Sequence, residues 1–156
     1  MNLILLSEKD KITCGRVVLS DRRARHIVSV LRSRVGDRLR MGMLQGNMGW
    51  GRVLDINGAG VELELELKTA PPPPNSATLI LALPRPKVLK RLLVMLTTLG
   101  VKHLVLVNSW RVDKSYWKSP VLEEENLRHY LCLGLEQARD TILPKVKLKR
   151  LFKPFV

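Results

Sequence analysis

The residues with the clearest chemical potential are arginines, seven of which lie between positions 22 and 40. Only Asp21 and Asp37 are acidic in this part of the chain. One guanidinium group can bind two phosphate oxygens at once. A run of arginines with few acidic partners therefore indicates contact with nucleic acid, RNA above all. A solvated helix face is the alternative interpretation. The candidate RNA ligands of this segment are Arg22, Arg23, Arg25, His26, Arg32, Arg34, Arg38 and Arg40.

A second candidate is the loop 108–118, which follows an apolar segment. It carries Trp110, Tyr116 and Trp117 among basic residues, of which Arg111 and Lys114 join the candidate RNA ligands. Aromatic rings can stack on bases while neighbouring cations bind phosphates. In the alternative interpretation the loop is a lid whose aromatic side chains pack on their own domain or on a partner subunit.

The spacing of other reactive residues indicates no catalytic or metal centre. His26, His103 and His129 are scattered, which is more typical of structural or surface histidines. Glycine-rich phosphate loops and the GxSxG nucleophile pattern are missing from the sequence. Cys14 and Cys132 lie too far apart for a CxxC site. We therefore assign no catalytic residue and expect neither a metal nor a disulfide.

Composition narrows the class of protein. The 156 residues include 27 Lys and Arg against 14 Asp and Glu, a net charge of +13, and 46% are hydrophobic. This balance indicates a folded protein that attracts polyanions. No apolar run approaches the ~20 residues of a membrane span, and the N-terminus does not resemble a signal peptide. We expect a cytosolic, cytoplasmic protein without a membrane partner.

Residues 1–70 are predicted to form a small antiparallel β-barrel with one helix. Ser20 and Asp21 suit the start of a helix that we expect to continue to Arg34. Its packed face would carry Ile27, Val30 and Leu31. Apolar or alternating patterns indicate strands at 3–6, 16–19, 38–41, 50–56 and 61–67.

In the second half, apolar runs alternate with helical periods in an order typical of a β-α-β-α-β parallel sheet. The apolar run 78–83 predicts a strand buried on both faces, and 103–107 predicts a second buried strand. Helices are expected from Pro86 to a stop at Gly100 and from about 123 to 141, before a strand that begins near Val146. Three strands and two helices amount to about half of an ordinary α/β domain.

Four prolines at 71–74 favour a stiff spacer. The predicted organisation is therefore a domain at 1–70, a Pro-rich linker at 71–77 and an α/β domain at 78–156.

Three segments, in order, resemble the RsmE family of 16S ribosomal RNA uridine N3-methyltransferases, which belong to the SPOUT class. They are HIVSVLRSRVGDRLRMGMLQGNMGWGRVLDI at 26–56, LILALPRPKVLKRLLVMLTTLGVKHLVLVNSWRVDKSYW at 79–117 and LGLEQARDTILPKVKL at 133–148. The first is similar to the family's PUA-like barrel, the second to the start of its methyltransferase domain and the third to its Glu-Gln…Arg…Pro helix end.

The resemblance implies a PUA-like RNA-binding barrel followed by the first half of a SPOUT methyltransferase domain. It implies methyl transfer from S-adenosylmethionine to a uridine of 16S ribosomal RNA, with the small ribosomal subunit as partner and a homodimer as the full-length state. Gln137 and Arg139 match family positions near the active face and become candidates for positioning the substrate.

The chain also departs from the family pattern. Met95 and Thr98 stand where the family commonly has Lys and Glu, and Asp140 stands at the usual arginine position. The family's Gly-Pro-Glu-Gly-Gly loop and the knot that binds S-adenosylmethionine are not found in the sequence. We expect a truncated chain without the cofactor site and without activity alone. Two alternatives remain: a non-catalytic RNA-binding module in ribosome assembly and, less well supported, a basic DNA-binding protein.

Overall fold

The computed structural model describes residues 2–150, so the last six residues of the predicted α/β domain lie outside it. The chain forms two compact units. One holds residues up to Pro71 together with Arg139–Thr141, and the other holds Pro72–Ala138 and the segment from Ile142 onward. Each unit has its own hydrophobic core.

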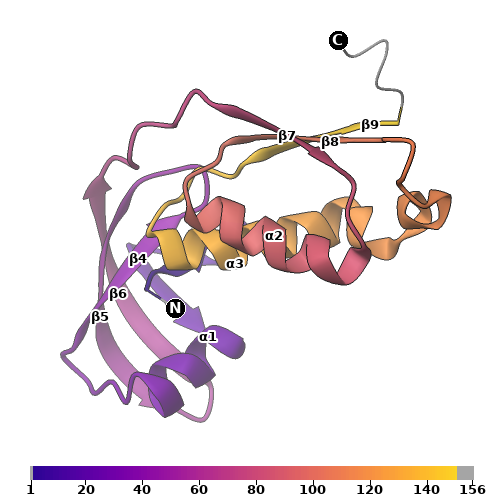
Figure 1. Ribbon diagram of the computed structural model, residues 1–156. Helices are drawn as coiled ribbons and strands as arrows, with labels where there is room; N and C mark the ends of the chain where they lie inside the picture. Colours follow the sequence, from indigo (N-terminus) through magenta and orange to yellow (C-terminus); the bar gives the residue numbers. More distant parts are fainter. Residues whose placement is uncertain (1, 151–156) are drawn as a thin grey trace. The chain divides into compact units, whose positions relative to one another are not determined.

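The first unit is built on a curled six-stranded sheet with the order β1-β4-β5-β6-β3-β2 (Figure 1). Its strands are β1 (Ile4–Leu6), β2 (Ile12–Thr13), β3 (Arg16–Leu19), β4 (Arg38–Met43), β5 (Met48–Asn57) and β6 (Gly60–Thr69). The sheet is mixed, not antiparallel throughout as expected, because β1 pairs with β4 in parallel. Register shifts between Met48 and Trp50 and between Val53 and Asp55 interrupt the β5–β6 ladder. Such irregularities bend a hairpin and increase its twist.

Alternation of side chains along these strands separates a core from a charged outer face. Alternate residues of β3 and β6, such as Val17, Leu19, Val61 and Leu63, are at most 1% exposed. Gly49 allows an especially close approach in the β5–β6 pair, because a Cβ there would lie 1.9 Å from the carbonyl oxygen of Glu66.

The segment after Asp21 differs from the single helix to Arg34 that the sequence predicts. An α-helix, α1, covers only Arg22–Arg25, and a π-helix follows at His26–Val30. The wider π turn rotates the following side chains away from the face that an α-helix would bury. Ile27 is fully buried as predicted, but Val30 is 64% exposed and Leu31 is 42% exposed.

A short return segment completes the first unit. Thr141 is fully buried, and its hydroxyl donates to the carbonyl oxygen of Gly46 at 2.6 Å. Its own carbonyl oxygen accepts from the backbone N–H of Gln45 at 2.8 Å. The β4–β5 turn is thus held by residues that follow it by nearly a hundred positions.

The second unit is a three-stranded parallel sheet with two helices on one face (Figure 1). The strands are β7 (Thr78–Ala82), β8 (His103–Val107) and β9 (Lys145–Lys149), in that spatial order. Helix α2 (Pro86–Thr98) begins at a proline suited to its first turn, and α3 covers Glu124–Ala138. Short 3-10 helices at Lys114–Lys118 and Pro120–Leu122 were not predicted.

The prediction that β7 is buried on both faces is wrong. Leu79 and Leu81 pack toward the helices, whereas Ile80 is 51% exposed. The reason is that β7 is an edge strand and both helices cover the same face of the sheet. The central strand β8 is buried as predicted, since its neighbours flank Val105 and Val107 on both sides.

Helices α2 and α3 touch closely at Gly134, whose backbone faces Thr97. A Cβ at Gly134 would lie 2.5 Å from the Cβ of Thr97 and 2.7 Å from the carbonyl oxygen of Val94. Thr97 is almost completely buried, and its hydroxyl donates to the carbonyl oxygen of Leu93 at 2.7 Å. A glycine in mid-helix thus permits the contact. None of the helices formed by residues 2–150 has the length and apolar character to cross a membrane.

The π-helix leads to a prediction that separates neighbouring apolar side chains. Ile27→Ala removes methyl groups from a fully buried site and is expected to lower the free energy of unfolding by about 2–5 kcal/mol. Val30→Ala at an exposed site should change it by less than about 0.5 kcal/mol. Urea unfolding followed by circular dichroism measures both. Equal losses would mean that Val30 packs as the α-helical pattern predicts.

Candidate nucleic-acid interface

The arginine-rich segment is shaped by hydrogen bonds at both of its ends. Asp21 accepts from the backbone N–H of Arg23 at 2.8 Å and so begins α1. Arg32, two residues after the end of the π-helix, has a φ of +53°, an uncommon left-handed conformation for a residue other than glycine. Beyond it, the carboxylate of Asp37 accepts from the backbone N–H of Arg34 at 2.8 Å. Asp21 and Asp37 therefore each stabilise the backbone conformation of the segment through a hydrogen bond to a backbone N–H.

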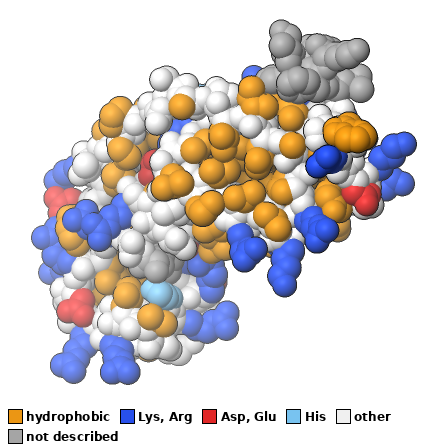
Figure 2. All heavy atoms as spheres, viewed as in Figure 1, with side chains coloured by type: hydrophobic (Ala, Val, Ile, Leu, Met, Phe, Trp, Pro, Cys, Tyr) orange, Lys and Arg blue, Asp and Glu red, His pale blue; other side chains and the backbone are white. Residues whose placement is uncertain are grey.

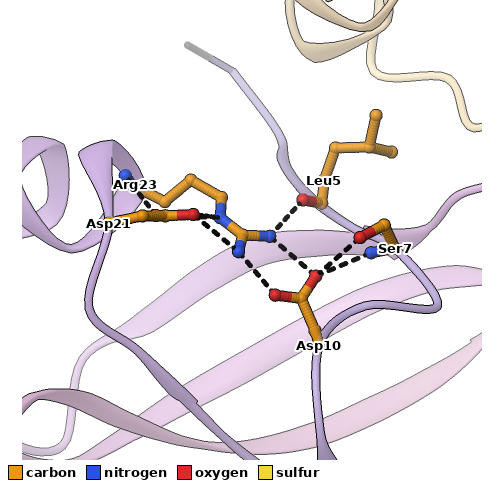
Figure 3. A network of polar contacts seen from close by, with 5 residues as sticks. All are labelled: Leu5, Ser7, Asp10, Asp21 and Arg23. Atoms are coloured by element: carbon orange, nitrogen blue, oxygen red, sulfur yellow. Dashed lines mark hydrogen bonds and ion pairs between the residues drawn. The ribbon is translucent and has the colours of Figure 1, made fainter. Parts of the chain in front are cut away.

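Arg23 lies at the centre of a polar cluster that the sequence did not indicate (Figure 3). Its guanidinium donates to the carbonyl oxygen of Leu5 at 2.8 Å and to both oxygens of Asp10, at 2.5 and 2.9 Å. Its Nε also donates to the carboxylate of Asp21, at 3.0 and 3.1 Å. Asp10 in turn accepts from the backbone N–H and the hydroxyl of Ser7. One side chain thus joins β1, the loop after it and the start of α1.

The electrostatics of this cluster favour its charged form. Burial pushes the pKa of Asp10 upward, but hydrogen bonds from Arg23 and Ser7 outweigh it and hold that pKa below its ordinary value near 3.8. The pKa of Asp21 is lowered in the same way, with burial opposed by the hydrogen bonds of Arg23. Burial acts against the charge of Arg23 as well, yet the two carboxylates raise the pKa of Arg23 overall.

Other arginines of the segment remain available to a ligand. Arg25, Arg32 and Arg34 are exposed, and none of the three forms an ion pair with a residue between positions 2 and 150. Arg22 is also exposed, and His26 is half-buried. Exposed apolar side chains lie in the same segment: Val28, Val30, Leu31 and Val35. A surface that combines cations with apolar groups can bind phosphates and also pack against sugars and bases.

Arg38 and Arg40 project from β4 beside Trp50, a residue that sequence reasoning missed. Their Cζ atoms lie 5.3 and 4.8 Å from the centroid of the Trp50 ring, within cation–π range. Trp50 is 36% exposed and lies directly opposite Arg40 in the β4–β5 register. The alternation of apolar and polar residues along β5 could have indicated Trp50, because it places Trp50 and Arg52 on the same outward side of the strand.

The outer face of β3, β5 and β6 is electrically balanced. The pairs that it carries are Arg16 with Glu62 at 3.6 Å, Arg52 with Glu64 at 2.9 Å, and Lys68 with Glu66 at 2.9 Å. Arg38 also lies 3.7 Å from Glu66. These carboxylates repel phosphate, so this face suits RNA less well than the segment around Arg32.

The two positioning candidates lie at the end of α3. Gln137 is exposed in its last turn, and Arg139 follows the helix, exposed and with a φ of +56°. Gln137 borders an apolar groove of about 500 Å³ between α2 and α3, which the exposed Met95 and Leu99 also line. Hydrophobic side chains gather over these helices, with Lys and Arg along the border (Figure 2). Met95 and Thr98 line this groove without adding a charge to it.

Arg111 and Lys114 are exposed in the loop after β8, in the second unit. The loop's aromatic residues divide: Tyr116 and Trp117 pack against the core, as the lid interpretation expects, whereas Trp110 is 90% exposed. His103 and His129 lie in β8 and α3 and are not brought together with other candidates. Among residues 2–150, no three His, Cys, Asp or Glu side chains are grouped so that they could hold a metal ion.

Comparison with known proteins places the chain in a family. The RNA methyltransferase domain family matches residues 71–156, more than half of the chain. The chain belongs to the RNA methyltransferase domain family. The resemblance to the RsmE family that the sequence motifs indicated is confirmed by matches along nearly the whole chain.

Two curated relatives show the extent of the match. The ribosomal RNA small subunit methyltransferase E of Treponema pallidum is 31% identical over 99% of this chain and 59% of its own length. A ribosomal RNA small subunit methyltransferase E of Borreliella burgdorferi is 25% identical over 95% of this chain and 61% of its own length. The chain therefore spans about three fifths of these relatives.

Solved structures show the same fold. Ribosomal RNA small subunit methyltransferase E of Neisseria gonorrhoeae, determined bound to S-adenosyl methionine, has a TM-score of 0.66 at 21% identity. The match covers 97% of this chain and 60% of that one. A probable rRNA methyltransferase of Porphyromonas gingivalis has a TM-score of 0.67 at 19% identity, over 96% of this chain and 60% of that one.

The Arg23 cluster predicts that arginines of one segment differ in their effect on stability. Arg23→Gln leaves the largely buried carboxylate of Asp10 without its ion-pair partner, and we expect a loss on the order of 3 kcal/mol in the free energy of unfolding. Arg25→Gln, which removes the same charge from an exposed site, should change it by less than about 0.5 kcal/mol. Urea unfolding at pH 7 measures both variants.

Acid should reduce the difference between these two variants. Because the pKa values of Asp10 and Asp21 are lower in the folded state, the cluster stabilises above their unfolded values and loses its contribution as the pH falls through the folded ones. Thermal melts between pH 7 and pH 3 follow this change. A constant gap between the variants over that range would contradict the ion-pair assignment.

Proposed function

We propose that the whole protein is an S-adenosylmethionine-dependent methyltransferase of small-subunit ribosomal RNA. Its family membership and the names of its relatives support this, as does the relative from Neisseria gonorrhoeae that was determined with the cofactor. The observation that carries the proposal for the described residues is the set of exposed arginines without acidic partners: Arg25, Arg32 and Arg34.

The two units would divide this work. The first unit, with its curled sheet and arginine segment, would be a PUA-like RNA-binding domain of residues 1–70. The second, after the linker 71–77, would be the first half of a SPOUT-type methyltransferase domain. Gln137 and Arg139 would position the substrate. We propose that the cofactor site lies outside this chain, because the only glycines after position 99, Gly100 and Gly134, end α2 and fill the α2–α3 contact.

The proposed reaction is transfer of the methyl group of S-adenosylmethionine to N3 of a uridine. N3 of uracil carries a proton at neutral pH, so a base or donors to the neighbouring O2 and O4 atoms must help to remove it. When bound, the cofactor would supply an electrophilic methyl group. The described residues would bind and orient the RNA. No catalytic base is assigned among them.

We further propose a cytoplasmic homodimer as the state of the whole protein. Ribosomal RNA and the small ribosomal subunit would be its partners. The apolar groove beside Met95 and Leu99 supports the dimer, because exposed apolar surface of this kind is typical of protein contacts.

The RNA-binding role predicts a loss of salt dependence. Each phosphate contact on a single strand contributes ~0.7 to the slope of log affinity against log salt concentration, so joint Arg25→Gln, Arg32→Gln and Arg34→Gln should flatten the slope by about 2. The melting temperature should stay unchanged, since all three side chains are exposed. Fluorescence anisotropy with a small-subunit RNA hairpin at several salt concentrations gives the slope.

The outer strand face offers a matched control. Joint Arg16→Gln, Arg52→Gln and Lys68→Gln removes the same charge from residues that are paired with glutamates. We expect less than half of the change in slope. An equal change in both triple variants would indicate a general charge effect and would contradict a defined interface.

The catalytic proposal is tested with the whole protein. We expect it to transfer tritium from methyl-labelled S-adenosylmethionine to small ribosomal subunits. Reverse transcription of the product should stop at one uridine, because a methyl group on N3 blocks the pairing edge of the base. RNA binding without methyl transfer would overturn the proposal and leave the non-catalytic assembly module as the function.

A further inference from the structure

We propose that Trp110 is a stacking platform for an unpaired RNA base, with Arg111 and Lys114 as ligands of the flanking phosphates. The inference rests on the proposed RNA-binding function and adds a second site, in the other unit, to the arginines of the first. It begins from the contrast among the three aromatic residues of the loop 108–118.

The loop is held in place by residues other than Trp110. Tyr116 and Trp117 pack against the core of the second unit, as does Val112. The indole N–H of Trp117 donates to the side-chain oxygen of Asn108 at 3.0 Å, which joins the end of the loop to its beginning. Asp113 accepts from the backbone N–H of Ser115 at 2.8 Å and begins the 3-10 helix. The loop therefore has a defined structure of its own.

Trp110 contributes nothing to that packing. Its side chain is 90% exposed, the largest exposed fraction among the big hydrophobic residues of the described chain. A tryptophan can bury some 150–250 Å² when it is packed, so exposing it forgoes much of the burial energy that an indole can supply. Arg111 lies over the ring of Trp110, with its Cζ 5.5 Å from the ring centroid.

The charges around Trp110 favour a polyanion. Arg111, Lys114 and Lys118 are exposed, and the single acidic residue of the loop, Asp113, is engaged with Ser115. In the part of the second unit that holds this loop, Figure 2 shows hydrophobic and basic side chains next to each other, with an acidic one among them. Arg150, which follows β9, lies over the ring of Trp117 with its Cζ 5.7 Å from the ring centroid and adds a further cation.

The position in the fold supports a ligand site. β8 and β9 are parallel, so the loop after β8 and Arg150 after β9 lie at the same carboxyl edge of the sheet. The backbone N–H of Asn108 donates to the carbonyl oxygen of Lys149 at 3.2 Å, which ties the two strand ends together. In open α/β sheets this is the edge at which ligands bind.

RNA suits this site better than a protein surface does. A protein partner would be expected to cover a group of apolar side chains around the tryptophan. Within 108–118, however, Trp110 is the only large hydrophobic residue that is exposed, and its neighbours Ser109 and Arg111 are polar and exposed. Every base has a π-face, so an isolated indole among cations can stack on an unpaired nucleotide of any sequence.

The test compares single-stranded with double-stranded RNA. The full 156-residue chain is titrated into a fluorescein-labelled 12-nucleotide uridine oligomer and into a 12-base-pair RNA duplex, with anisotropy as the readout. Trp110→Ala should weaken binding to the single strand about 5- to 150-fold, because base stacking on an aromatic side chain contributes ~1–3 kcal/mol. Affinity for the duplex should not change, since its bases are already stacked.

Two further variants separate stacking from other effects. Trp110→Tyr keeps an aromatic ring and should retain most of the affinity, and neither Trp110 variant removes charge, so the salt slope should not change. Ile80→Ala removes an apolar side chain that is 51% exposed on the same unit and should leave both affinities unchanged. Thermal melts verify that each variant is folded.

The outcomes are distinguishable from those of the proposed function. Unchanged single-strand affinity in Trp110→Ala overturns the inference and would leave the exposed indole to a protein partner. Equal losses for single strand and duplex also overturn it. A flattened salt slope in the Arg25, Arg32 and Arg34 variant, together with unchanged single-strand affinity in Trp110→Ala, would support the proposed RNA-binding surface while refuting this second site.

Discussion

The polar cluster around Arg23 is the interaction on which the candidate interface depends. A single guanidinium binds two carboxylates and a backbone carbonyl oxygen, and it thereby joins β1, the loop containing Asp10 and the first turn of α1. The π turn that follows is stabilised by its own backbone hydrogen bonds, but its starting point is set by this cluster. The exposed Arg25, Arg32 and Arg34 follow Arg23 in the chain, so they lie on a segment whose first turn is held in place by this cluster.

This arrangement divides the basic residues by role. Arg23 is a structural residue in the middle of a basic run, and on the outer strand face glutamates accompany Arg16, Arg52 and Lys68. The cations that we propose as RNA ligands lie in two places: the segment around Arg32 in the first unit, and the loop around Trp110 in the second. Net charge indicates the class of partner, and acidic neighbours decide which cations can reach it.

Most strands were predictable from the sequence, because alternation and apolar runs report burial directly. β3 and β8 have the predicted bounds, Arg16–Leu19 and His103–Val107. The early end of the helix expected to reach Arg34 was not predictable from the sequence. One extra residue in a helical turn changes the direction in which all later side chains point, and no local sequence pattern signals it. The exposure of Ile80 depends on where distant helices pack, and the role of Asp10 depends on a partner thirteen residues away. The candidate arginines could be selected by type, but only contacts separate Arg23 from Arg25.

The return of the chain at Arg139–Thr141 has a consequence for how the protein can be divided. Three peptide connections join the two units, at Pro71–Pro72, Ala138–Arg139 and Thr141–Ile142. A protease that cuts the proline run separates the chain into two polypeptides, but the second of them carries Thr141, whose hydrogen bonds to Gly46 and Gln45 belong to the first unit. A recombinant fragment ending near residue 70 would lack Thr141, and the carbonyl oxygen of Gly46 and the N–H of Gln45 would lose their partners. An RNA-binding fragment is better produced with this tripeptide restored, for example through a short linker or as a circular permutant.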